Sequence, residues 1–133
     1  MLKDIEFKKS EQIAIAVVPE ASGEETMWTV YFLNLGPQKV ENVLITSRGY
    51  GEINGKEVKT AILRWFLGDI EPEEACKVEE IPEDVSLLNN EFWVSYYIDK
   101  VIYDKKYVFV LDSLQAMHMT DVPILASKGI LIR

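Results

Sequence analysis

Apolar and polar residues alternate over most of this chain, which is the pattern of β-strands that bury one face. Segments rich in Val, Ile, Tyr, Phe, Trp and Thr recur at roughly 10–15-residue spacing, with turn residues between them. At Thr26–Leu35 the alternation places Trp28, Val30 and Phe32 on one face. We predict seven or eight strands: Ile13–Val18, Thr26–Leu35, Val40–Ser47, Val58–Leu67, Ala75–Ile81, Glu91–Asp99, Val101–Leu111 and part of Ile124–Arg133.

Turn residues separate these strands. Asn54-Gly55 predicts a type I′ hairpin turn, because both central residues of that turn need positive φ. Asp99-Lys100 joins the two longest strands as a second hairpin, and the C-terminal stretch turns near Lys128-Gly129. Short helical turns are predicted over residues 82–88, where Pro82 suits the first position, and over residues 112–119.

This organisation predicts an all-β fold, an antiparallel β-sandwich that forms one domain over residues 1–133, with a closed barrel as the second choice. The chain has 133 residues, of which 48% are hydrophobic, and no repeat or linker. A domain of this size buries about two-thirds of its unfolded surface. Within Val58–Leu67 the apolar face of Ala61, Leu63, Trp65 and Leu67 is predicted to face the core.

The net charge of −8 is concentrated in one segment. Residues 69–91 contain nine acidic residues and one basic residue, Lys77, and the rest of the chain is neutral. Such an acidic protein repels phosphate backbones, which disfavours nucleic-acid binding. The segment is interpreted as a solvated edge or as a face that attracts a basic partner.

Cysteine usage and hydropathy predict a cytoplasmic protein without membrane contact. The only cysteine, Cys76, permits no intrachain disulfide and no cysteine-based zinc site. The first ten residues lack the apolar run of a signal peptide. The longest purely apolar run, Ala14–Val18, is far below the ~20 residues that span a bilayer.

Two resemblances refine the fold. Residues 28–36, ending in Asn34-Leu-Gly36, and residues 40–45 resemble the B and C strands of immunoglobulin-like adhesion and accessory domains. Residues 67–73 resemble the turn before their strand E, and residues 92–110 resemble their F–G hairpin. The resemblance implies an immunoglobulin-like sandwich, without the cysteine pair of antibody domains.

Residues 47–53 together with residues 103–107 are similar to a family of short, uncharacterised bacterial all-β proteins, some of which are designated phenylalanyl-tRNA synthetase subunits. This chain is too short for a synthetase catalytic domain and lacks the motifs that bind ATP in such an enzyme. The family resemblance therefore implies no catalytic residue.

Candidate chemistry is sparse. His118 is the only histidine, and it has no second metal-ligand type at a useful spacing. Cys76 is interpreted as an inert core thiol, with a thiolate beside Lys77 as the alternative. We therefore predict no enzyme activity, no metal and no cofactor.

The segment Ser47–Glu52 is the most unusual one. Its two glycines, Gly49 and Gly51, allow close backbone approach, and Arg48 could hold a phosphate or carboxylate. It lacks the ending of a P-loop. A small-ligand site at Arg48, Tyr50 and Glu52 is one interpretation, and a β-bulge with glycine at positive φ is the other.

Aromatic and basic residues around the last long hairpin form the second candidate surface. The better core face is Phe92, Val94, Tyr96 and Ile98, which leaves Trp93 and Tyr97 exposed as candidates for a partner surface. Lys105 and neighbouring lysines beside tyrosines could grip single-stranded nucleic acid, or could protect an edge strand from aggregation.

These observations favour a non-catalytic protein–protein interaction module that binds a protein partner or a second copy of itself. The apolar segment Ile124–Ile132 could add as a strand to its own sheet or to a neighbour's. The alternatives are a small-ligand-binding protein with its site at the Arg48 segment, and a nucleic-acid-associated accessory protein.

Overall fold

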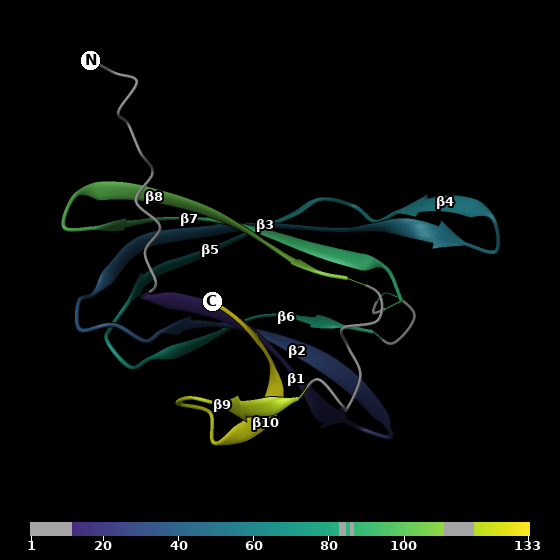
Figure 1. Ribbon diagram of the computed structural model, residues 1–133, viewed down its shortest axis with the longest axis horizontal. Coiled ribbons are helices and arrows are strands. Elements are labelled where there is room, and N and C mark those ends of the chain that lie inside the picture. Colours follow the sequence, from purple (N-terminus) through teal and green to yellow (C-terminus); the bar gives the residue numbers. More distant parts are fainter. Residues whose placement is uncertain (1–11, 83–84, 86, 111–118) are drawn as a thin grey trace, which may run out of the picture.

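A computed structural model describes residues 12–82, 85, 87–110 and 119–133. They form ten strands, arranged in two layers (Figure 1). The strands are β1 (Ile13–Ser22), β2 (Glu25–Asn34), β3 (Val40–Ile53), β4 (Lys56–Lys59), β5 (Leu63–Ile70), β6 (Ala75–Ile81), β7 (Asn89–Ile98), β8 (Val101–Phe109), β9 (Thr120–Val122) and β10 (Ser127–Ile132).

Both layers are antiparallel sheets. The first has the order β6-β2-β1-β10-β9, and the second has the order β4-β3-β7-β8, with β5 also paired to β3. β3 is the longest strand, and β4 and β5 pair with its two ends on the same edge. The predicted all-β sandwich is confirmed, although the described residues hold ten strands rather than seven or eight.

The core lies between the two sheets, where the predicted alternation holds. Trp28, Val30 and Phe32 pack inward from β2. From β7, Phe92, Val94, Tyr96 and Ile98 are buried. The second sheet therefore buries one face and turns the side chains between these residues outward.

Two-residue turns join β3 to β4 and β7 to β8. Asn54 and Gly55 have φ of 52° and 78°, which confirms the predicted type I′ geometry. Asp99 and Lys100 have φ of 49° and 63°, so this hairpin adopts positive φ twice without a glycine. The β3–β4 hairpin projects beyond the sandwich (Figure 1).

The predicted strand Val58–Leu67 is wrong in one respect, because it is interrupted at Thr60–Ile62. Thr60 leaves the strand direction to bond β3: its N–H donates to the Gly49 carbonyl at 2.9 Å, and its Oγ1 accepts from the Gly49 N–H at 2.7 Å. Trp65 and Leu67 pack on the core as predicted, whereas Ala61 and Leu63 are exposed.

The C-terminal segment turns over residues 123–126, not at Lys128-Gly129 as predicted. Ile124 and Ala126 take positive φ there, and Lys128 and Gly129 lie within β10. β10 inserts between β1 and β9, so the segment completes its own sheet.

Little helical structure is described. The N–H of Val85 donates to the Pro82 carbonyl and that of Leu88 to the Val85 carbonyl, both at 3.0 Å, which is the three-residue spacing of a tight helical turn. The predicted turn over residues 112–119 lies outside the described residues except for Met119, and so does His118.

Gly129 is a position where any side chain should destabilise the sandwich. A Cβ there would lie 2.7 Å from the Val17 carbonyl oxygen and 2.9 Å from Val18 Cγ2. We expect Gly129→Ala to lower the free energy of unfolding by about 1–3 kcal/mol, as overpacking does. Urea unfolding would measure it, with Lys128→Ala as the neighbouring control, since the Lys128–Asp121 ion pair is exposed. Equal unfolding free energies for the two variants would contradict the expectation.

Candidate functional site

The segment Ser47–Glu52 lies inside β3, which corrects the predicted β-bulge with glycine at positive φ. Among the described glycines, those with positive φ are elsewhere, at Gly23, Gly55 and Gly68. Gly49 serves packing instead, because a Cβ there would lie 3.0 Å from Thr60 Cγ2 and 3.4 Å from Leu88 Cδ1. Arg48 lies within the paired part of β3, between the buried residues Ser47 and Gly49, so its side chain points out of the sandwich.

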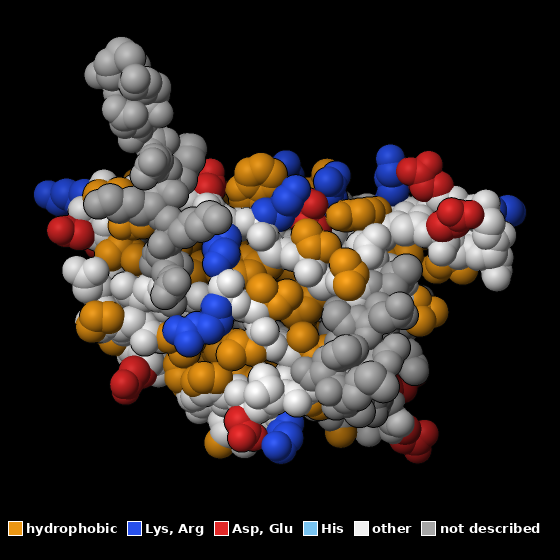
Figure 2. Space-filling view, viewed as in Figure 1, with side chains coloured by type: hydrophobic (Ala, Val, Ile, Leu, Met, Phe, Trp, Pro, Cys, Tyr) orange, Lys and Arg blue, Asp and Glu red, His pale blue; other side chains and the backbone are white. Residues whose placement is uncertain are grey.

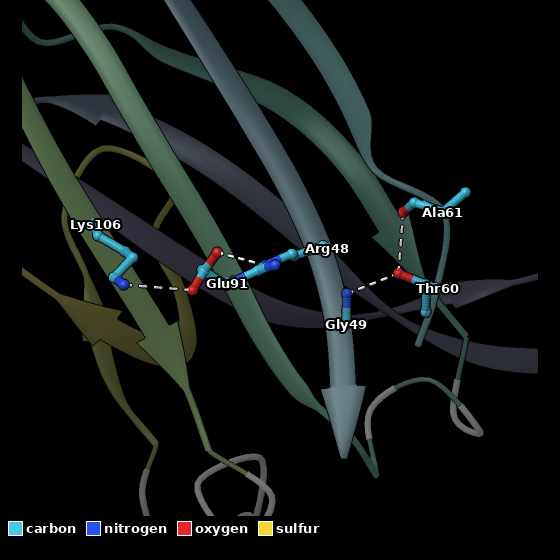
Figure 3. A network of polar contacts seen from close by, with 6 residues as sticks. All are labelled: Arg48, Gly49, Thr60, Ala61, Glu91 and Lys106. Carbon is cyan, nitrogen blue, oxygen red and sulfur yellow. Dashed lines mark hydrogen bonds and ion pairs between the residues drawn. The ribbon is translucent and has the colours of Figure 1, made fainter. Parts of the chain in front are cut away.

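An ion-pair network crosses three neighbouring strands (Figure 3). Arg48 Nε on β3 donates to Glu91 Oε2 on β7 at 2.7 Å, and Lys106 Nζ on β8 lies 3.6 Å from Glu91 Oε1. Although Glu91 is on the outward side of its sheet, its side chain is only 8% exposed. The two cations compensate a carboxylate that would otherwise be costly to bury.

Both cations also contact aromatic rings. The Arg48 guanidinium carbon lies 5.3 Å from the centroid of the Tyr50 ring. Lys106 Nζ lies 5.6 Å from the centroid of the Trp93 ring. These cation–π contacts hold the rings of Tyr50 and Trp93 against the two cations.

We define the outer face as the outward side of β5, β3, β7 and β8, together with Ile62, which directly precedes β5. Its side chains are those of Glu41, Leu44, Thr46, Arg48, Tyr50, Ile62, Arg64, Phe66, Glu91, Trp93, Ser95, Tyr97, Ile102, Asp104, Lys106 and Val108. Its large apolar members are between 37% and 70% exposed: Leu44, Ile62, Phe66, Trp93, Tyr97 and Ile102. The upper rim of Figure 2 shows hydrophobic side chains there beside side chains of both charges. An apolar concentration of this kind marks an interaction surface.

A shallow groove of about 440 Å³ runs over the centre of the outer face. The small side chains of Thr46 and Ser95 line it together with the larger Leu44, Ile62 and Trp93. Its polar lining comes from Arg48, Glu91 and Asp104. The groove thus offers an apolar surface with both signs of charge close to it.

The structure brings together five of the six predicted site residues. Arg48, Tyr50, Trp93 and Tyr97 share the outer face, and the predicted exposure of Trp93 and Tyr97 is confirmed. Glu52 lies further along β3, and it lines an open hollow of about 610 Å³ together with Arg48 and Tyr50.

Lys105 is the predicted site residue that lies apart. It is paired with the buried Val94, so it is directed to the inner side of the sheet, and its Nζ lies 5.0 Å from the Tyr107 ring centroid. Lys106 occupies the outer face instead. In a hairpin with a two-residue turn at Asp99-Lys100, Trp93 and Lys106 are directly opposite each other. The sequence alone was therefore enough to predict this pair.

A second cleft, of about 250 Å³, lies between the sheets where the edge strand is interrupted. Leu63, Ile81 and Phe92 contribute apolar walls, and Glu79 contributes a partly buried carboxylate. Trp65 Nε1 donates to Ser47 Oγ at 3.4 Å. Burial raises the pKa of Glu79, and its hydrogen bond with Ser47 opposes part of that rise.

Glu79 should make the stability of the protein depend on pH. Because folding raises the pKa of Glu79 above 4.5, the folded chain binds the carboxyl proton more tightly than the unfolded chain does. The protonated carboxyl therefore contributes stability below pH 4.5, and this contribution is lost as the pH rises through the pKa of the folded state. Glu79→Gln cannot ionise and should escape this loss. We expect the variant to gain stability relative to the natural chain from pH 4.5 upward, measured by urea unfolding across pH. Glu80→Gln is the control on the same strand, and a constant difference across pH would contradict the assignment.

The acidic residues of the segment 69–91 do not share one face among the described residues. Glu91 forms ion pairs with Arg48 and Lys106, and Glu79 lines the cleft between the sheets. Glu80 forms an ion pair with Lys77, with 2.7 Å between Oε1 and Nζ. The exposed remainder gathers where β5 turns into β6: Asp69, Glu71, Glu73 and Glu74. The exposed acidic residues of the segment therefore gather at one turn, and Glu91 is the member of the segment that lines the groove.

Cys76 is half-buried, and burial, followed by the charge of Glu74, raises the pKa of its thiol. No three His, Cys, Asp or Glu side chains among the described residues gather closely enough to hold a metal ion. Within the same part of the chain, no helix has the length and apolar character to cross a membrane.

No protein-family model and no curated protein matches this chain. A similar solved structure is the sporulation control protein Spo0M from Bacillus subtilis, with 15% sequence identity and a TM-score of 0.34. The similarity covers 76% of this chain and 49% of the Spo0M chain, so this chain spans about half the length of that protein. The resemblances noted in the sequence stay predictions.

Proposed function

We propose that this protein is a non-catalytic protein–protein interaction module that binds through its outer face. The observation that carries the proposal is the exposure of six large apolar side chains on one sheet face, of which Phe66 is 70% exposed and Trp93 is 48% exposed. Monomeric proteins rarely expose apolar side chains so close together unless a partner covers them.

The composition of the outer face also supports binding. Trp, Tyr and Arg dominate the energetic centres of protein interfaces, and Trp93, Tyr97 and Arg48 lie on the same face here. Arg48, Lys106 and Trp93 are held by the ion pairs and the cation–π contact of the Glu91 network, so these side chains would lose little conformational entropy on binding. A rigid sheet face of this type suits a pre-formed interface better than a catalytic centre.

The strand order supports an immunoglobulin-like origin for the module. The neighbours β6-β2-β1 correspond to strands E, B and A of an immunoglobulin-like sandwich, and β3-β7-β8 correspond to C, F and G. β5 departs from the constant-domain order, because it pairs with β3 rather than with β6. The single cysteine fits a role in a reducing compartment, and we propose the cytoplasm as the location.

Affinity capture with paired variants tests the proposal. Tagged natural protein should retain a stoichiometric protein partner, or a second copy, at low and at moderate salt, and Trp93→Ser should lose it. Leu87→Ser is the matched control, because Leu87 is an exposed hydrophobic residue between β6 and β7, away from the outer face. Equal retention by both variants, with circular dichroism showing both folded, would overturn the proposal.

A small-ligand-binding role is the second candidate, and the inter-sheet cleft is what favours it. The cleft reaches Arg48 and Gly49 from the inner side. Arg48 already donates to Glu91, so the anion-binding argument for it is weaker, and Glu79 becomes the central polar group. A thermal-shift series with alkylamines should show stabilisation that Glu79→Gln abolishes; no stabilisation would remove this candidate.

A further inference from the structure

We propose that the partner of the outer face is a second copy of this chain, with Phe66 of each copy seated in the groove of the other. The inference rests on the proposed function, since it names the occupant of the same surface. It would make the protein a dimer of two sandwiches stacked through their β5-β3-β7-β8 sheets.

The charges of the outer face are self-complementary. In a twofold dimer the same patch meets itself, so a patch of one sign would repel its copy. The outer face carries three basic and three acidic residues: Arg48, Arg64, Lys106, Glu41, Glu91 and Asp104. The net charge of −8 therefore lies elsewhere on the chain, away from the contact.

The order of these charges along the strands permits a matched contact. Arg48 is level with Glu91, and Asp104 is level with Ser95, four residues further along β7. Both Arg48 and Asp104 line the groove, so they stand at different levels of it. When the strands of the second copy run in the opposite direction, the part of one groove that is level with Arg48 faces the part of the other groove that is level with Asp104.

The shapes of Phe66 and the groove are also complementary. Phe66 is the most exposed large hydrophobic side chain among the described residues. It pairs with Leu44, which lines the groove, so it projects beside the groove and not into it. A cavity of about 150 Å³ can hold benzene, and the groove of about 440 Å³ has room for a phenyl ring.

The same face is poorly suited to a strongly charged partner. Its acidic and basic residues balance, so it provides no field of one sign to attract such a partner. Two sheet faces with apolar side chains can instead stack about 10 Å apart and interdigitate, as the two layers of a sandwich do. A second copy supplies such a face with matching charges.

Sedimentation velocity across a wide concentration range tests this inference on the full chain. The natural protein and Leu87→Ser should reach a dimer as concentration rises. Phe66→Ser removes the inserted ring, and Ser95→Trp fills the groove without removing an apolar residue. Each should raise the dimer dissociation constant at least tenfold, which is about 1.4 kcal/mol.

Two outcomes would overturn the inference. One is a monomer at every concentration of the natural protein. The other is an unchanged dimer in both Phe66→Ser and Ser95→Trp, with circular dichroism confirming that the variants fold. Neither outcome decides the proposed function, because capture of a different protein that Trp93→Ser loses would still support an interaction module.

Discussion

Ending the chain after Asp121 should abolish cooperative folding. The truncation removes β10, whose register pairs Ile15 with Ile132 and Val17 with Ile130 on β1. β1 lies in the middle of its sheet, and all of its residues from Ile13 to Val17 are fully buried. Without β10, one side of this buried strand would lose its hydrogen-bond partners, and unpaired buried backbone groups are costly.

The loss should exceed what a single core substitution costs. It removes the buried side chains of Val122 and Ile130 along with the β1 ladder, where burying one such side chain is worth about 1.5–3 kcal/mol. Domains of this size are stable by about 5–15 kcal/mol in total. Far-ultraviolet circular dichroism with urea titration measures the outcome, and removal of Arg133 alone is the control. A cooperative transition at the natural midpoint would show that the segment is dispensable.

Asn34→Ala should lower the free energy of unfolding by about 3 kcal/mol, as expected when buried polar groups lose their partners. Asn34 is fully buried at the end of β2. Its Nδ2 donates to the Gln38 and Ile70 carbonyls at 2.8 and 3.1 Å, and its Oδ1 accepts from the Gly36 N–H at 3.1 Å. One side chain thus joins the β2–β3 connection to the end of β5.

Urea unfolding would measure the effect, and Gln12→Ala provides a graded comparison. Gln12 Nε2 donates to Asn34 Oδ1 at 3.2 Å from the margin of the same network, and Gln12 is only partly buried. We expect the Gln12 variant to lose less stability than the Asn34 variant. An Asn34→Ala chain with the natural unfolding midpoint would show that water replaces these hydrogen bonds.

Much of the fold follows from local chemistry that a sequence displays. Asn54-Gly55 is the residue pair that a type I′ turn requires, and the alternation in β2 and β7 identifies their buried faces. The interruption at Thr60–Ile62 has no such signal, because it depends on bonds between Thr60 and the distant Gly49. The C-terminal turn escaped prediction because Ile124 and Ala126 adopt positive φ, which their residue types do not favour.

The candidate surface could be predicted in part. The exposure of Trp93 and Tyr97 follows from the alternation of inward and outward side chains along β7. The same alternation, continued through the Asp99-Lys100 turn into β8, places Lys106 rather than Lys105 on the outer face. The outward direction of Phe66 follows from the predicted core face of its strand, but its place beside Leu44 could not be foreseen, because it depends on which strand pairs with the edge of β3. The pairing of Arg48 with Glu91 likewise joins residues that are distant in sequence and meet only through strand order.

The pairing of β1 with β10 has a consequence for the order of events during protein synthesis. β1 is made first among the described strands and β10 last, yet they are neighbours in one sheet. Contacts between residues so distant in sequence form slowly, because the long intervening loop must close first. The second sheet, built from β3, β4, β5, β7 and β8, needs no residue beyond β8 for its pairing. The first sheet stays incomplete until β10 pairs, and until then the buried β1 has one open apolar edge of the kind that makes incompletely folded chains prone to aggregate.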